Sequence, residues 1–531
     1  RLMAEKNLAA YVIPATDPHM SEYLPEHWRV LNWASGFTGS AGTLVVTKDF
    51  AGLWTDSRYF IQAEQQLAGT GIELMKLTVP HTAEFVDWLT DRLSEGDTVG
   101  LDGNLLSRGW YQILEKRTRG EGIRLDPHAD LVTPLWAERP ALPAEPVYEH
   151  PSKFTGASRK QKLAQVREKL AESKAGYTVL STLDDIAWLF NLRGRDVPYN
   201  PVFVAHAAVG PKEAALFIDP AKLPDDIRRQ LNRDGVRVYP YKAVTDYLGK
   251  LPAGAAVLID PKRISQNLPG ALPESVKIIE GTNATTWLKA CKEAKERKNI
   301  RETMVKDGVA LTKFFYWLSQ TVGKQKITEL DAEEKLRALR LEQDGCLGES
   351  FGIISAYGPH AALPHYSATP DSNAELKPRG LYLLDSGGQY FGGTTDTTRV
   401  ISLGEITPEE RTDYTLVLKG MIGLSRLHFP RGTRGYQIDA LARAPQWMLG
   451  INYGHGTGHG VGYFLNVHEG PQGISSSAAV QAPMMPGMIT SVEPGIYRTG
   501  KHGVRIENLV LCVEGEKTEF GEFLRFETLT L

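Results

Sequence analysis

Cysteine is scarce in this chain of 531 residues, which has only Cys291, Cys346 and Cys512. The three lie far apart, and no C-x-x-C pair occurs. A disulfide framework needs an even number of cysteines that can pair, so we expect none. Unpaired thiols are typical of proteins in a reducing compartment. The cysteine content therefore predicts a cytoplasmic protein.

The chain also lacks an excess of positive charge and any long hydrophobic run. It has 60 Lys and Arg against 63 Asp and Glu, which gives a formal net charge of -3. Proteins that bind nucleic acids usually have a clear basic excess, so we expect no nucleic-acid partner. No run of about eighteen apolar residues, the length of a transmembrane helix, occurs. The first residues include no hydrophobic region typical of a signal peptide, so we expect neither secretion nor a membrane span.

The most unusual segment of the sequence is rich in both glycine and histidine. Residues 455–471 are HGTGHGVGYFLNVHEGP. No frame of this segment matches the G-x-G-x-x-G phosphate loop, and no G-x-x-x-x-G-K-[ST] sequence occurs in the chain. His455 and His459 have the four-residue spacing of a helical zinc motif, but the alternating glycines oppose a helix. They favour an extended or looped backbone, and in an extended chain the two histidines share a face.

A proline-rich segment, residues 137–155, has no apolar period and is predicted to be a linker. On both sides of it, strand-like runs alternate with amphipathic stretches, such as the helical pattern at residues 159–174. Each side also contains a Trp, then a Gly, then two predicted strands, which indicates a weak duplication of one α/β unit. Chance similarity between two α/β domains is the alternative explanation. His19, His81 and His128 are scattered through the N-terminal half, and we expect them to be structural.

The third region begins near Thr285 and combines helical patterns with strand-like runs. A long helical pattern follows Thr285, and shorter ones cover residues 332–341, 408–427 and 436–449. Between and after them lie apolar runs such as GLYLLDSG, TTRVISLG and ENLVLCVE, which are typical of strands. The whole chain is therefore predicted to be α/β (α+β), and this region contains most of the residues suited to chemistry.

Two segments of this region share one plan, in which an apolar strand ends in a carboxylate and a second carboxylate opens the next strand. The first, LYLLDSGGQYFGGTTDTTRVISL, contains Asp385 and Asp396. The second, MITSVEPGIYRTGKHGVRIENLVLC, contains Glu493 and Glu507. A Gly, a Tyr and a glycine-containing turn separate the two carboxylates in each segment. We therefore predict two hairpins, each of which brings a pair of carboxylates face to face.

Carboxylates beside apolar runs are unfavourable in a protein core unless they are paired or bind a metal ion. Four of them would repel one another, and one or two divalent cations remove that cost. Oxygen ligands together with one imidazole suit Mn²⁺ or Co²⁺, with Zn²⁺ or Fe²⁺ as alternatives. Taken singly, an Asp before a Gly is most often a turn residue, and a lone His is most often structural. The joint occurrence of two matching segments and a histidine-rich segment favours a metal site.

These segments together resemble the aminopeptidase P (Xaa-Pro aminopeptidase) branch of the pita-bread metallopeptidases, peptidase family M24. The matching stretches include LLDSGGQYFGGTTDTTRV, HGTGHGVGYFLNVHEGP, SVEPGIY and GVRIENLVL, and earlier ones such as SGFTGSAGTLVVT, DVPYNPVF and AYGPHAALPHY agree. The resemblance implies two creatinase-like N-terminal α/β domains, residues 1–140 and 155–284. It also implies a pita-bread catalytic domain, residues 285–531, with a pseudo-duplicated, curved antiparallel sheet.

The resemblance further implies a role for individual residues. The family's five metal ligands match Asp385, Asp396, His459, Glu493 and Glu507. In the family, the residues that match Asp396 and Glu507 bridge two metal ions, usually manganese. The match to Asp385 completes the shell of one ion, and the matches to His459 and Glu493 complete that of the other.

Three more histidines and an arginine match further active-site residues of the family. They are His365 in LPHY, His455, His468 in NVHEGP, and Arg505, which matches an arginine that steadies a ligand carboxylate. We expect His455 and His468 to line the proline-side pocket, and His365 or His468 to stabilise the oxyanion. Glu493 is the candidate proton shuttle from the attacking water to the proline nitrogen.

These matches predict a dinuclear metal-dependent exopeptidase. It would release the N-terminal residue from peptides with proline in second position, by attack of a hydroxide that bridges the two metal ions. The ions are expected to be Mn²⁺, with Co²⁺ or Zn²⁺ as alternatives. The resemblance also implies a homodimer.

Four alternatives stay open. The nearest is prolidase, which uses the same metal ligands on Xaa-Pro dipeptides only; the long N-terminal half and the form of the histidine segment favour the aminopeptidase. Methionine aminopeptidase shares the ligands, but its chains lack the doubled N-terminal domains. Creatinase shares the fold without the metal ligands, which are all present here. A non-catalytic pita-bread binding protein is the fourth, and such relatives commonly lose ligands.

Overall fold

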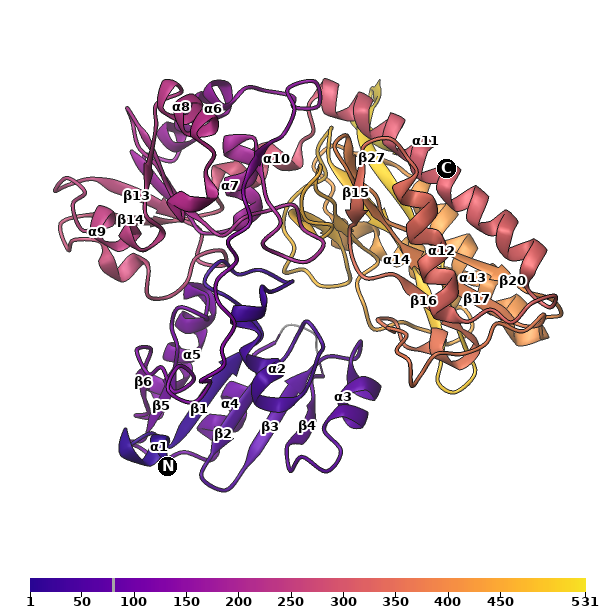
Figure 1. Cartoon of the computed structure of the whole chain (residues 1–531), viewed down its shortest axis with the longest axis horizontal. Helices are drawn as coiled ribbons and strands as arrows, with labels where there is room; N and C mark the ends of the chain where they lie inside the picture. The colour runs from indigo at the N-terminus through magenta and orange to yellow at the C-terminus, as the bar shows by residue number, and fades with distance from the viewer. Residues whose placement is uncertain (79–81) are drawn as a thin grey trace. The chain divides into compact units, whose positions relative to one another are not determined.

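The computed structural model describes residues 1–78 and 82–531, so His81 lies outside the described residues. These residues form two compact units, which can be followed by residue number in Figure 1. The first unit comprises Arg1–Glu149, Ser158–Pro198 and Val202–Thr285, and the second comprises His150–Ala157, Tyr199–Pro201 and Thr286–Leu531. Among the described helices, none combines the length and the apolar character that crossing a membrane requires.

The first unit contains two six-stranded sheets with one topology. The first sheet has the spatial order β4 (Glu73–Lys76), β3 (Ala51–Thr55), β2 (Thr43–Thr47), β1 (Ala10–Pro14), β5 (Thr98–Leu101), β6 (Arg124–Asp126). The second has the order β12 (Val236–Tyr239), β11 (Ala214–Phe217), β10 (His206–Val209), β8 (Tyr177–Leu180), β13 (Ala256–Ile259), β14 (Lys277–Glu280). In each sheet the fourth strand is antiparallel to the third and parallel to the fifth. This shared order is what the predicted duplication of one α/β unit requires.

Helices connect the strands of both sheets, and capping residues explain where two of them begin. Their bounds are α1 (Leu2–Glu5), α2 (Val30–Ser35), α3 (Phe60–Gln66), α4 (Glu84–Thr90), α5 (Arg108–Gly120), α6 (Arg159–Glu172), α7 (Leu183–Phe190), α8 (Asp225–Arg233) and α9 (Val244–Leu248). Ser107 caps α5, and Ser158 forms a capping box with Gln161 at the start of α6. Strands β7 (Tyr148–Glu149) and β9 (Leu192–Arg193) form a separate pair.

One of the scattered histidines shows the environment of a structural residue. His19 is buried, and its Nδ1 lies 2.8 Å from the carbonyl oxygen of Ser181. Its Nε2 lies 2.9 Å from the hydroxyl oxygen of Tyr241. Both ring nitrogens therefore have partners, as a buried histidine requires.

The second unit contains four long helices that the sequence predicts in type. They are α11 (Ala294–Thr321), α12 (Glu329–Leu341), α13 (Pro408–Ser425) and α14 (Gly435–Trp447). The helical pattern that starts near Thr285 is not continuous, because α10 (Ala284–Ala290) ends before α11 begins. Glu293 causes the break by forming a capping box with Glu296, which gives α11 its own N-terminus.

Each predicted hairpin is confirmed and contains a smaller hairpin. In the first, β17 (Leu381–Ser386) pairs with β20 (Thr397–Ser402), and β18 (Gly388–Tyr390) with β19 (Gly393–Thr394) inside it. In the second, β24 (Ile489–Val492) pairs with β27 (Asn508–Thr518), and β25 (Gly495–Arg498) with β26 (His502–Arg505) inside it. The chain therefore builds the same motif twice, after two helices each time.

The hairpins extend into larger antiparallel sheets that the helices cover (Figure 1). β16 (Ile354–Tyr357) joins β17 and β20, and β15 (Cys346–Glu349) joins β18 and β19. The second half has the order β21 (His428–Pro430), β28 (Gly521–Thr528), β27, β24, β22 (Gly458–Gly460), β23 (Glu469–Ile474). Side chains of β17 alternate between two cores: Tyr382 and Leu384 pack with α11 and α12, whereas Leu381 and Leu383 pack with α13 and α14. By this period of two, Asp385 lies on the side of Leu383.

Candidate metal centre

The four predicted carboxylate ligands lie at matching positions of the two hairpins. Asp385 is the fifth residue of β17, and Asp396 directly precedes β20. Glu493 directly follows β24, and Glu507 directly precedes β27. Since β17 pairs with β20 and β24 pairs with β27, the members of each pair lie on neighbouring strands. Strand pairing thus places one carboxylate at or next to the end of each of the four strands β17, β20, β24 and β27.

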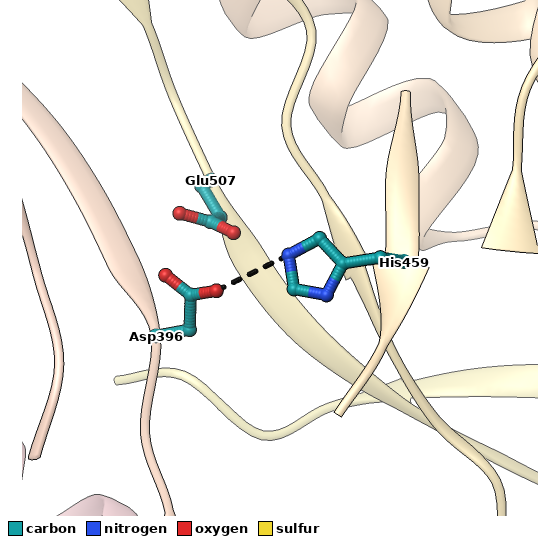
Figure 2. A group of neighbouring side chains, drawn as sticks. All are labelled: Asp396, His459 and Glu507. Atoms are coloured by element: carbon teal, nitrogen blue, oxygen red, sulfur yellow. Dashed lines mark ion pairs between the residues drawn. The ribbon is translucent and has the colours of Figure 1, made fainter. Parts of the chain in front are cut away.

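Three of the predicted ligands form a compact group, which Figure 2 shows. Asp396, His459 and Glu507 each offer one ligand atom, and these atoms lie within 4.8 Å of one another. His459 Nε2 lies 3.3 Å from Asp396 Oδ2 and 3.4 Å from Glu493 Oε1. Oxygen and imidazole donors at this density are the ligands of a divalent transition metal.

The ring of His459 is oriented by the carbonyl group of the next residue, and its backbone is held by a serine. Its Nδ1 lies 2.9 Å from the carbonyl oxygen of Gly460 and donates to it, which leaves Nε2 as the nitrogen that faces the carboxylates and would bind a metal ion in place of its proton. The backbone N–H of His459 donates to Ser491 Oγ at 2.9 Å, and Ser491 Oγ donates to Glu493 Oε1 at 3.1 Å. One serine therefore fixes two of the predicted ligands.

Close backbone approach explains two glycines of the histidine segment. A Cβ on Gly458 would collide with the carbonyl oxygen of Ser491, and one on Gly460 with that of Glu469. The segment is not helical, as predicted, and its strand parts are Gly458–Gly460 and the first residues of β23, which begins at Glu469. The shared face of His455 and His459 was predicted for an extended chain, and that condition is not met, because residues 454, 455 and 457 bend before the strand begins. His455 Nε2 instead lies 2.7 Å from the hydroxyl oxygen of Tyr497.

Arg505 neutralises part of the negative charge, as the resemblance implies. Its guanidinium donates to Asp385 Oδ2 at 2.6 and 3.1 Å and to the Tyr497 hydroxyl at 2.8 Å. Asp385 Oδ1 is buried and, among the described residues, has no hydrogen-bond partner. Thr398 donates to Glu507 Oε2 at 2.9 Å. Asp385 thus keeps one buried oxygen that a cation would satisfy.

The carboxylates of this group repel one another, and a bound cation would reduce that repulsion. Burial, and then the three neighbouring carboxylates, raise the pKa of Glu507 well above its usual range. Burial is also the main cause that raises the pKa values of Glu493 and Asp385. Burial by itself would lower the pKa of His459, but the neighbouring Asp396 and Glu493 raise it to about 9. These donors fit divalent metal ions.

The other predicted site residues lie in three different places. His468 contacts His459 directly, with the two rings edge to face and their centroids 4.3 Å apart. His455 lies beside Tyr453 and Tyr497, at ring-centroid distances of 4.9 and 5.4 Å. His365 is half-buried and lies outside the strands, between the short 3-10 helix η5 (Gly358–Ala362) and β17.

Sequence reasoning missed the residues that hold the ligands in place. Ser491, Tyr497 and Thr398 each bond a predicted site residue. Tyr497 is the Tyr noted in the second hairpin segment, but only the fold shows that it joins His455 to Arg505.

A serine in the G-x-S-x-G pattern at residues 348–352 is not a nucleophile elbow. That Ser350 is buried, donates to the carbonyl oxygen of Thr395 at 2.8 Å, and is followed by strand β16.

Family models cover nearly the whole chain. Two models described as "Creatinase/Prolidase N-terminal domain" match residues 1–133 and 138–296, and "Metallopeptidase family M24" matches residues 298–514. The "Probable Xaa-Pro aminopeptidase P" of Paracoccidioides brasiliensis (strain Pb18) is 40% identical over 550 residues, which cover 100% of this chain and 89% of that protein. The chain belongs to the Xaa-Pro aminopeptidase P family. The Neurospora crassa protein with the same name is also 40% identical and is covered over 80% of its length.

Solved structures agree with this membership of the aminopeptidase P family. An X-prolyl aminopeptidase from Caenorhabditis elegans, described as a cytosolic enzyme with a di-nuclear active site, is 36% identical with a TM-score of 0.94. The match covers 99% of this chain and 86% of that chain. An Xaa-Pro dipeptidase from Bacillus anthracis is 23% identical with a TM-score of 0.56, over 70% of this chain and 98% of that chain. At that identity it shows only that the fold is shared.

Proposed function

We propose that this chain is a dinuclear metal-dependent exopeptidase that releases the N-terminal residue from peptides with proline in second position. The observation that supports it most is the compact group of Asp396, His459 and Glu507, with Glu493 in contact with His459 and Asp385 on the strand paired with β20. The chain that carries this donor set is 40% identical to an Xaa-Pro aminopeptidase P over its whole length. Intact ligands argue against a non-catalytic binding protein.

Five residues would hold the two ions in this proposal: Asp385, Asp396, His459, Glu493 and Glu507. The family resemblance implies that Asp396 and Glu507 would be shared by both ions, that Asp385 would serve one ion, and that His459 and Glu493 would serve the other. When bound, the ions supply a water of lowered pKa and polarise the carbonyl of the first residue. Arg505 orients Asp385 through Oδ2, so that Oδ1 faces away from the guanidinium.

Proton transfer falls to Glu493. Ser491 donates to Glu493 Oε1, which leaves Oε2 as the oxygen that takes a proton from water. An X-Pro bond is a tertiary amide without an N–H, so the leaving proline nitrogen needs that proton. Glu493 Oε2 then delivers it to the ring nitrogen.

The remaining histidines act on the substrate side. His468 lies against the ring of His459, where it can donate to the oxyanion that forms at the scissile carbonyl. His455, fixed by the Tyr497 hydroxyl, lines the proline side of the site. His365 is the alternative donor to the oxyanion.

Removal of a bridging ligand tests the proposal. Asp396→Ala and Glu507→Ala should each abolish both metal uptake and Xaa-Pro cleavage, because each removes an oxygen from both ions. Metal content by mass spectrometry and hydrolysis of an Xaa-Pro peptide are measured on the same preparation. Activity that persists in metal-stripped protein would refute the dinuclear mechanism.

We extend the proposal to the metal, the assembly, the compartment and the domains. Mn²⁺ is the proposed ion, with Co²⁺ or Zn²⁺ as alternatives, and metal analysis of the purified protein tests it.

Trp447, Met448 and Leu449 are exposed together at the end of α14, which supports a homodimer that sedimentation equilibrium would detect. The free cysteines support a cytoplasmic location, which fractionation tests. Family models that meet near residues 133–138 and 296–298 support the division into domains 1–140, 155–284 and 285–531.

A further inference from the structure

Glu329 is a buried carboxylate at the first position of α12 that gathers hydrogen bonds from one distant segment. The backbone N–H of Tyr357 donates to Oε1 at 2.7 Å, and that of Ala374 donates to Oε2 at 2.9 Å. His360 Nδ1 lies 2.9 and 3.0 Å from the two oxygens, and the Tyr366 hydroxyl donates to Oε2 at 2.9 Å. One side chain thus holds both ends and the middle of residues 357–374.

The backbone of Glu329 joins the same arrangement. Its N–H donates to the carbonyl oxygen of Ala374 at 3.0 Å, and its carbonyl oxygen accepts from Ser355 Oγ at 2.8 Å. The rings that bond the carboxylate also stack on each other, with the centroids of His360 and Tyr366 4.5 Å apart. Both ends of the 357–374 segment are therefore hydrogen-bonded to a single residue of α12.

The held segment packs against strands of the candidate metal centre. Its helix η5 packs against β26, which contains Arg505, and against β17, which contains Asp385. The packing is close, because a Cβ on Gly503 would collide with the carbonyl oxygen of Ala361. His365 lies in this segment, directly before the Tyr366 that bonds Glu329.

We propose that Glu329 is a positioning residue that sets the place of His365 in the active site, an inference that rests on the proposed function. Glu329 touches none of the five predicted metal ligands in its hydrogen bonds given above, so its effect passes through the 357–374 segment. A carboxylate suits the task because its two oxygens have about four acceptor positions and no donor. A glutamine there would turn an amide N–H₂ toward N–H and O–H donors and lose the bonds at one end.

A double-mutant cycle between Glu329 and His365 tests the proposal. Glu329→Gln should lower kcat for an Xaa-Pro peptide about 10- to 100-fold in the wild-type background, with metal content unchanged. In the His365→Ala background the same change should lower kcat less than about twofold, because the residue it positions is gone. Asp331→Asn is the matched control: Asp331 caps the same helix turn through Thr328 and should leave kcat unchanged.

Two further measurements keep the test decisive. Hydrogen exchange of the Tyr357 and Ala374 amides should speed up in Glu329→Gln, whether or not the enzyme is active. Tyr366→Phe, which removes one bond to Glu329, should lower kcat in the same direction by a smaller factor if Glu329→Gln fails to fold. Equal kcat losses in both backgrounds, loss of metal, or unchanged exchange would overturn the proposal. A wild-type protein that cleaves no Xaa-Pro peptide would overturn the proposed function instead, while the exchange data would still report on the segment.

Discussion

At the scale of the residue, three histidines close in sequence have three different environments. His459 presents Nε2 to two carboxylates because its Nδ1 donates to the Gly460 carbonyl oxygen. His468 packs edge to face on His459, and His455 bonds the Tyr497 hydroxyl. A shared residue type therefore implies no shared role, because the partner of each ring nitrogen decides whether it donates or accepts.

The division between ligand and substrate-side histidine predicts the effect of His468→Ala. We expect kcat to fall about 100-fold, the typical cost of losing one donor to an oxyanion. Metal content should stay near that of the wild type, because the predicted ligands keep their own partners. Both quantities are measured on one sample, and His428→Ala, at an exposed position of β21, serves as the control. Loss of metal would make His468 a ligand.

At the scale of the element, one helix in each half of the second unit, α12 or α14, forms hydrogen bonds that hold a segment containing an active-site histidine. Glu329 of α12 holds residues 357–374. On α14, Arg443 bonds Asp439 at 2.7 Å and donates to the carbonyl oxygens of Tyr453 and His455 at 2.8 and 2.9 Å. A buried charge of each helix is thus satisfied by backbone groups of an irregular segment, which gives that segment one conformation.

Helix α13 holds the inner hairpin β25–β26 by a buried carboxylate, which has a testable pH dependence. Asp413 accepts from Arg498 at 2.8 and 2.9 Å and lies 2.8 Å from His502 Nε2. Burial by itself would raise the pKa of Asp413, but Arg498 and His502 hold it below its ordinary value. A carboxyl group with a depressed pKa stabilises the fold above the ordinary Asp pKa of about 3.9, and the gain is lost as pH falls through the folded pKa.

Asp413→Asn should therefore lower the stability of metal-free protein by about 2 kcal/mol at pH 7, because Arg498 and His502 lose a charged hydrogen-bond acceptor. The difference in thermal midpoint from the wild type should narrow as the pH falls below the ordinary Asp pKa of about 3.9, where the wild-type carboxyl group takes up a proton. Glu409→Gln on the same helix removes an exposed ion pair with Lys501 and should have little effect. A difference that does not narrow as the pH falls below about 3.9 would contradict this assignment.

At the scale of the whole molecule, membership of the aminopeptidase P family concerns both units. The relatives align with 100% of the chain, and the N-terminal family models match residues 1–133 and 138–296. The dipeptidase structure covers only 70% of the chain.

The proposed exopeptidase function predicts a preference for substrate length. A peptide that continues beyond the proline gains contacts that an Xaa-Pro dipeptide cannot make, and binding energy of remote groups raises kcat/KM. We expect kcat/KM for a longer Xaa-Pro peptide to exceed that for the dipeptide by at least about tenfold, or about 1.4 kcal/mol. The same peptide with alanine in second position is the control and should resist cleavage. A dipeptide preference would favour prolidase.

The sequence by itself determined the local parts of this protein: the α/β class, the helices of the second unit, the two hairpins and the residue types of a metal site. These follow from apolar period, turn glycines and the chemistry of carboxylates and imidazole, which act over a few residues. Only the tertiary structure decided the break between α10 and α11, the different partners of His455 and His459, and the supporting contacts of Ser491, Tyr497 and Thr398. Arg505 and Asp385 are 120 positions apart, and Glu329 is 45 positions from Ala374. Such pairs meet because the two hairpins and their helices pack around shared cores, and no local pattern specifies that packing.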